Sequence, residues 1–187
     1  MKTCRVCKAK FTPRLQMQIA CSLECALSLA VSKRGKEEKR ALVLERKADK
    51  VKREKLKTVA QLIAAAQIQF NAFIRERDKD KGCFVCGRPF RDAPGQVQHA
   101  GHVRSRGAAG HLRFNEDNCH GECEGCNGPR GAKPHQIKAG AIARIGQERY
   151  DALESDNKPH KWQHDELRAI KTKYTAKSRE LKKAIHD

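Results

Sequence analysis

The amino-acid sequence predicts a helix-rich α+β protein whose fold depends on bound zinc. Eight of its nine cysteines stand in four closely spaced pairs, an arrangement typical of two four-cysteine zinc sites. Only 5% of the 187 residues are aromatic and 33% are charged, so we expect a small apolar core and metal sites that supply part of the folding free energy. Segments with helical spacing or dense charge flank a cysteine-rich middle, which indicates a small domain with helical extensions.

Residues 1–30 contain the first two cysteine pairs, Cys4-x2-Cys7 and Cys21-x3-Cys25. This spacing predicts a small Cys4 zinc finger, and the alternative is four buried thiols without metal. Ser22 is a good N-cap and would place Cys25 at the third position of a helix.

Residues 31–57 are a basic linker. Within it, residues 33–57 carry twelve Lys/Arg against five Asp/Glu and no proline. The composition predicts an exposed basic helix or a partly disordered linker. A helix here would be either a solvated face or a line of phosphate contacts that are independent of sequence and sensitive to salt.

Residues 58–77 are predicted to form a strongly amphipathic helix whose apolar stripe packs on the core. The apolar residues recur at steps of three and four: Val59, Leu62, Ile63, Ala66, Phe70, Phe73 and Ile74.

Residues 83–127 are the chemical centre of the chain. They open with Cys83-x2-Cys86 and close with Cys123-x2-Cys126. The two pairs can together bind one tetrahedral Zn²⁺, which is structural because four thiolates leave no open coordination position. Cys119 and His120 are alternative ligands that could replace one thiolate of this quartet.

Between these pairs the sequence predicts two short strands followed by a helix. The first strand, from Val97 to Val103, would carry His99 and His102. The second is predicted at Leu112–Phe114, and the metal-binding helix at Cys126–Asn127, with an interrupted start because Pro and Gly follow.

The rest of the chain is predicted to be helical. Residues 135–153 have helical spacing weakened by Gly140 and Gly146, and Trp162 to Ile185 form a basic amphipathic helix. The expected organisation is a zinc finger at 1–30, a basic helical linker at 31–57, the core with its packing helices at 58–153, and a C-terminal basic helix at 154–187.

The charge balance points to a polyanionic partner. The chain has 40 Lys+Arg against 22 Asp+Glu, a net charge of +18, which favours nucleic acid over a merely basic or ribosome-associated protein. Aromatic residues are too few for a single-strand stacking platform. With neither a signal-peptide pattern nor an apolar run of transmembrane length, we expect a cytoplasmic protein without membrane partners.

The order Cys-x2-Cys, His, Asn, Cys-x2-Cys-Asn resembles the HNH superfamily, and particularly phage Holliday-junction resolvases of the endonuclease VII type. The whole chain resembles the lambdoid-phage NinG (Rap) recombination proteins. The phrases that carry this resemblance are residues 70–78 (FNAFIRERD), 100–107 (AGHVRSRG), 112–118 (LRFNEDN) and 123–127 (CEGCN). The resemblance implies a treble-clef ββα-metal nuclease core, and bacterial host cytoplasm as the location.

The resemblance also implies roles for individual residues. His102 matches the general base, Asn118 the central Asn that orients the catalytic loop, and Asn127 a ligand of a catalytic Mg²⁺ or Mn²⁺. Gly101 departs from the pattern, because many such sites have an acidic metal ligand directly before the base. His99 or Asp92 would then supply the missing ligand, or Asn127 would act with water and substrate phosphate.

These observations predict a structure-selective endonuclease that cleaves Holliday junctions and D-loops during phage recombination. The alternative is a non-catalytic zinc-finger protein that binds nucleic acid, and a zinc-knuckle adaptor is a third. Four arginines are expected to contact DNA phosphates: Arg104, Arg106, Arg113 and Arg130. Because resolution of a junction needs two symmetric cuts, we expect a homodimer, with phage or host recombination proteins as further partners.

Overall fold

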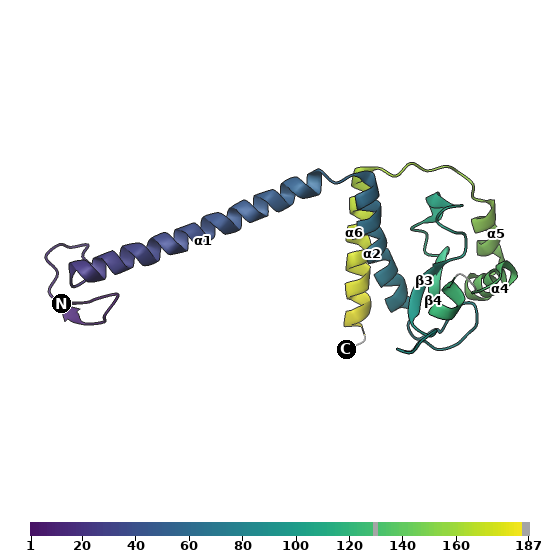
Figure 1. The fold of residues 1–187 in the computed structure, drawn as a ribbon, viewed down its shortest axis with the longest axis horizontal. Helices are drawn as coiled ribbons and strands as arrows, with labels where there is room; N and C mark the ends of the chain where they lie inside the picture. The colour runs from purple at the N-terminus through teal and green to yellow at the C-terminus, as the bar shows by residue number, and fades with distance from the viewer. Residues whose placement is uncertain (129–130, 185–187) are drawn as a thin grey trace. The chain divides into compact units, whose positions relative to one another are not determined.

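The computed structural model describes residues 1–128 and 131–184. The chain divides into two compact units, Met1–Lys57 and Thr58–Asp187. Figure 1 shows the elements that make up each unit.

The first unit is a small cysteine-rich fold that continues into one long helix. Strands β1 (Lys2–Thr3) and β2 (Lys10–Phe11) pair antiparallel. Helix α1 (Leu23–Lys55) then begins at Ser22, whose hydroxyl accepts a hydrogen bond from the Cys25 backbone at 3.2 Å, as the sequence predicts. The helix runs through residue 30 and includes most of the basic linker. It contains no buried residue, so the basic segment is a solvated helix.

The second unit is built on two helices packed side by side, α2 (Val59–Asp78) and α6 (His164–Lys183), as Figure 1 shows. Helix α2 starts at Thr58, which forms a capping box with Gln61. The main core cluster between α2, α6 and the hairpin consists of Leu62, Ala66, Phe70, Phe73, Ile74, Phe114, Cys119, Leu167 and Tyr174.

Helix α6 begins two residues later than the sequence predicts, because Gln163 and Glu166 form its capping box. Trp162 therefore precedes the helix and packs edge-on against Phe114 at 4.9 Å between ring centroids. The predicted end at Ile185 lies outside the described residues. None of the described helices is long and apolar enough to cross a bilayer.

An antiparallel hairpin lies against α2. Strand β3 (Gln98–His102) confirms the first predicted strand and pairs with β4 (Cys119–Cys123), in a register that sets His99 opposite Glu122 and His102 opposite Cys119. The predicted second strand at Leu112–Phe114 is wrong. Residues Gly110–Leu112 instead form a 3-10 turn, η1, in which the Leu112 backbone N–H donates to the Ala109 carbonyl.

The helices that follow the hairpin are short. Helix α3 (Glu124–Asn127) ends before α4 (Pro134–Ile145), and α5 (Gln147–Ser155) follows. The expected single helical stretch at 135–153 is thus two helices, separated at Gly146, whose φ of 84° ends α4.

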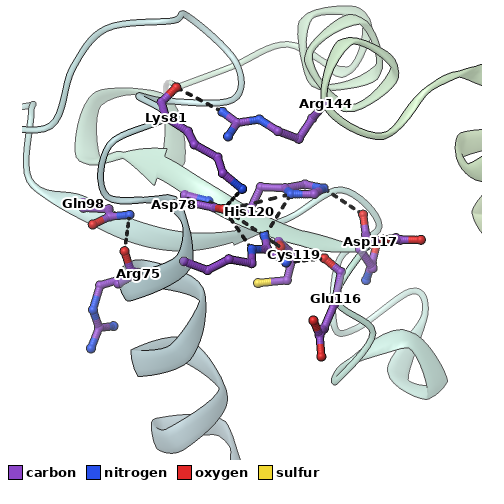
Figure 2. A network of polar contacts seen from close by, with 12 residues as sticks. Arg75, Asp78, Lys81, Gln98, Glu116, Asp117, Cys119, His120 and Arg144 are labelled. Carbon is purple, nitrogen blue, oxygen red and sulfur yellow. Dashed lines mark hydrogen bonds and ion pairs between the residues drawn. The ribbon is translucent and has the colours of Figure 1, made fainter. Parts of the chain in front are cut away.

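A buried ionic network ties α2 to the edge of β4 that does not pair with β3 (Figure 2). The fully buried Asp78 accepts two hydrogen bonds from Arg77, at 2.8 and 2.7 Å, and one from the Gly121 backbone at 2.9 Å. Burial alone would raise the pKa of Asp78, but the Arg77 guanidinium outweighs it and lowers that pKa to about 2. The carboxylate therefore stays ionised and fixes the hairpin on the helix.

Candidate metal centres and active site

Two cysteine quartets have the geometry of zinc sites. They are Cys4, Cys7, Cys21 and Cys25 in the first unit, and Cys83, Cys86, Cys123 and Cys126 in the second, and within each quartet all four sulfur atoms lie within 4.8 Å of one another. A tetrahedral zinc with Zn–S bonds of about 2.3 Å requires sulfur–sulfur distances of about 3.8 Å. The observed distances of 3.7 Å for Cys86–Cys123 and 3.8 Å for Cys21–Cys25 fit, so each quartet can hold one zinc ion.

The second quartet joins the hairpin to the helix that follows it. Gly87, with φ of 72°, lets its N–H reach the Cys83 carbonyl at 2.9 Å and so closes the first knuckle. Cys123 is the last residue of β4, and Cys126 lies in α3. A zinc ion here would therefore fix the end of the hairpin against α3.

Neither Cys119 nor His120 belongs to this quartet. The Cys119 sulfur lies 3.8 Å from Nδ1 of His102, and the His120 Nε2 lies 2.8 Å from the Asp117 carbonyl. The alternative in which one of them replaces a knuckle thiolate is therefore not needed, because four cysteines already converge.

His102, the last residue of β3, is held by contacts at both ring nitrogens. Its Nε2 lies 3.1 Å from the Arg113 carbonyl oxygen, which can only accept a hydrogen bond, so Nε2 carries the proton. The Nδ1 lone pair is consequently free to accept. Its neighbour is the thiol of Cys119, a weak donor whose pKa is raised by burial.

The His102 imidazole is neutral at neutral pH. Its pKa is lowered to about 4, chiefly by burial. The charges of Arg106 and Arg113 also lower this pKa, and the hydrogen bond to the Arg113 carbonyl opposes them. The side chain is thus an unprotonated imidazole in one tautomer.

Asn118 fixes the loop that follows His102. It is fully buried; its Oδ1 accepts from the Arg104 backbone N–H at 2.8 Å, and its Nδ2 donates to the carbonyls of Arg104 at 3.1 Å and Leu112 at 3.2 Å. These contacts hold both ends of the loop between the strands.

The two residues predicted to bind the catalytic metal, Asn127 and His99, lie on different elements. Asn127 is exposed at the end of α3. His99 is half-buried on β3, three residues before His102, so the alternation of the strand points the two histidines to opposite faces. Asp92 is exposed in the loop before β3.

The four predicted DNA-contacting arginines differ in availability. Arg106 is exposed, and Arg113 is half-buried and donates to Gln67 at 3.3 Å. Arg104 uses its guanidinium to donate to the carbonyls of Leu153 and Asp156, both at 2.7 Å, and so ties the loop to the end of α5. Arg130 lies outside the described residues.

Sequence reasoning missed Glu122. This residue is 4% exposed, lies opposite His99 on β4, and makes no hydrogen bond or ion pair with a described residue. Burial raises its pKa to about 7. If the second strand had been predicted at residues 119–123, the pairing of the two strands would have placed Glu122 on the same face as His99.

Comparison with known proteins matches residues 1–184 to the family model described as Bacteriophage Lambda NinG protein. Several curated relatives carry the name Protein ninG. That of Escherichia phage 933W is 37% identical over 192 residues, covering 97% of this chain and 94% of the relative. Those of Escherichia phage lambda and Salmonella phage P22 are each 36% identical over 187 residues. Each match covers 94% of this chain and 90% of the relative. No solved structure matches the chain. The chain therefore belongs to the phage NinG family.

Proposed function

We propose that this protein is a metal-dependent endonuclease of the HNH type that cleaves branched DNA. The proposal rests on the state and position of His102. Its imidazole is neutral and held in one tautomer. It lies at the end of a hairpin that a cysteine quartet, able to hold zinc, joins to the following helix. The order of strand, strand and short helix around a structural zinc agrees with a ββα-metal core.

In this proposal the protein's own groups perform three tasks. Nδ1 of His102 takes a proton from the attacking water, because Nε2 is already committed to the Arg113 carbonyl. Asn118 keeps the loop after His102 in place. The charge of the exposed Arg106 attracts a backbone phosphate toward the base. A Mg²⁺ or Mn²⁺ held with the help of His99 and Asn127 would stabilise the charge that develops on the phosphate.

The substrate class follows from charge and composition. A net charge of +18 and a 33-residue solvated helix without buried residues favour sequence-independent contact with DNA phosphates. With 5% aromatic residues, base stacking has little part. These features favour recognition of DNA shape, such as that of a four-way junction or a D-loop. Two symmetric cuts in a junction would require two copies of the chain.

A non-catalytic DNA-binding protein is the second candidate. Within the described part of the chain, the two cysteine quartets are the sole groups of three or more His, Cys, Asp or Glu side chains that converge on one point. A catalytic ion would therefore have fewer than three such protein ligands. Asn127, water and substrate phosphate would complete its coordination shell.

Cleavage of a labelled four-way junction beside a linear duplex of the same sequence separates these candidates. The zinc-loaded protein would be assayed with Mg²⁺, with Mn²⁺ and without added metal, and binding would be measured on the same DNA. Metal-dependent cutting of the junction supports the proposal, and equal cutting of both substrates replaces it with a general nuclease. Salt-sensitive junction binding without cutting under any metal would contradict it and favour the binding protein.

A further inference from the structure

Glu122 is a buried carboxylate that forms no hydrogen bond or ion pair with the described residues. The side chain is 4% exposed, and no described Lys, Arg or backbone N–H contacts it, although the chain carries a net charge of +18. In the described part of the chain, the fully enclosed side-chain atoms without a hydrogen bond belong to Arg144 and Ser178, so both oxygens of Glu122 retain contact with solvent. Burial of an unpaired carboxylate is unfavourable, and either protonation or a cation that enters from solvent would relieve this cost.

The backbone gives this carboxylate a defined place on the hairpin. Glu122 and His99 are partners in the strand register, and residues opposite each other in an antiparallel pair project to the same face. Ala100 and Cys119 on the other face pack in the core with α2. The face of Glu122 and His99 also carries His120, which meets the C-terminal end of α2 at Arg77. A carboxylate and an imidazole therefore share one surface of the hairpin.

Gly101 makes room for the carboxylate. A Cβ atom at residue 101 would overlap Oε2 of Glu122 and lie 2.9 Å from its Cβ. The glutamate thus extends across the strand pair into the space where a side chain at residue 101 would begin, directly before His102. Strand β3 has no acidic residue directly before His102, but the Glu122 carboxylate from β4 occupies the space beside residue 101.

We infer that Glu122 and His99 form a divalent-cation site on this face of the hairpin, with Glu122 in place of an acidic residue at position 101. One carboxylate and one imidazole leave several coordination positions for water and a phosphate oxygen, which suits Mg²⁺ and Mn²⁺. The role of the ion in cleavage rests on the proposed function, but its binding does not.

The test is titration of Mn²⁺ into the full-length, zinc-loaded protein, with free Mn²⁺ followed by electron paramagnetic resonance. Zinc is silent in this measurement and occupies the cysteine quartets. We expect Glu122→Gln, which keeps size and removes charge, to weaken Mn²⁺ binding at least tenfold. The matched control is Glu148→Gln, which makes the same change at an exposed carboxylate of α5 and is expected to leave binding unchanged. Asp92→Asn tests the other carboxylate that was expected as a metal ligand.

A second pair of variants tests the place of the carboxylate. Glu122→Gly is expected to lose Mn²⁺ binding, and the addition of Gly101→Asp to recover it, because the atoms nearest a Cβ at residue 101 all belong to Glu122. Zinc content and thermal unfolding establish that each variant folds. Failure of the double variant to recover binding while folded with full zinc content would contradict the placement at residue 101.

Failure of this inference differs from failure of the proposed function. Equal Mn²⁺ affinity in wild type and Glu122→Gln would overturn the inference even if the protein cuts DNA. Mn²⁺ binding that depends on Glu122, in a protein that cuts no DNA, would support the cation site and contradict the proposed endonuclease. Loss of binding in Asp92→Asn alone would place the ion on the loop before β3 and overturn the inference.

Discussion

Two neutral histidines, the half-buried His102 and the buried His120, make the stability of the fold depend on pH. Burial lowers the pKa of each to about 4, with nearby arginines adding to the effect. In the unfolded chain a histidine has a pKa of about 6.5. Between pH 6.5 and 4 the unfolded state therefore binds more protons than the folded state, so stability falls as the pH is lowered through this range.

Replacement of His102 by Gln is predicted to make the free energy of unfolding less sensitive to pH. From pH 7.5 to 6, the wild type should lose about 1 kcal/mol that the variant retains, because the variant has no imidazole to protonate on unfolding. Urea unfolding of both zinc-loaded proteins at several pH values measures this difference. Parallel curves for the two proteins would mean that His102 has an ordinary pKa in the folded state.

At the scale of single elements, α4 is held close to the first zinc knuckle by a glycine. Gly140 is buried, and a Cβ there would overlap the Phe84 carbonyl oxygen and lie 3.0 Å from its carbonyl carbon. The helix approaches the knuckle backbone at this point, and Phe84, Ala141 and Tyr150 pack around it as a second core cluster. Gly140 is thus a requirement of packing, although it lowers helix propensity.

Gly140→Ala is predicted to destabilise the second unit by about 1–3 kcal/mol, because α4 must move away from the knuckle. Gly35→Ala is the matched control, since Gly35 lies in α1 with nothing within 4 Å of its Cβ position. That change should instead favour the helix by about 0.5–1 kcal/mol. Thermal unfolding followed by circular dichroism compares the two, and a neutral Gly140→Ala would contradict the close approach.

The elements that the sequence predicts well are those with strong local signals. The spacing of the apolar residues identifies α2, and the cysteine pairs identify both quartets, because metal ligation needs specific residue types at specific spacing. Strand β4 escaped prediction because all of its residues, Cys119 to Cys123, are buried and no apolar–polar alternation marks it. The strand predicted at Leu112–Phe114 is instead a turn, and both apolar side chains enter the core from it.

The same error hid part of the site. Without β4 in place, no local pattern brings Glu122 opposite His99 or Cys119 beside His102, since these contacts depend on register between strands. The roles expected of His102 and Asn118 could be inferred from their motif, but the hydrogen bond to the Arg113 carbonyl required the fold. The hydrogen bond from Arg104 to the Leu153 carbonyl in α5 is likewise a tertiary contact that no sequence pattern indicates.

At the scale of the whole molecule, the apolar clusters are small. The clusters around Phe84 and Leu112 contain three buried residues each, and the first unit has none of these clusters among its described residues. Zinc bound to the four thiolates of each quartet would restrict the chain in both units and link metal binding to folding. Removal of zinc with a strong chelator should therefore unfold the knuckles of each unit.

The purified protein is predicted to hold two zinc ions per chain. Cys86→Ser should hold one, because it removes a ligand from the second quartet. Cys119→Ser should keep both, because Cys119 lies against His102 and outside the quartets. Elemental analysis of the three proteins measures the zinc content, and loss of one ion in Cys119→Ser would contradict the assignment of ligands.

The measurement that tests the central claim most directly is the single-turnover rate of junction cleavage by wild type, His102→Ala and His164→Ala with Mg²⁺. His164 is an exposed histidine at the start of α6 and serves as the control. The account predicts that His102→Ala lowers the rate about 10²–10⁴-fold while junction affinity and zinc content stay unchanged, and that His164→Ala cuts as fast as wild type. Equal cleavage rates for His102→Ala and wild type would contradict the assignment of His102 as the base.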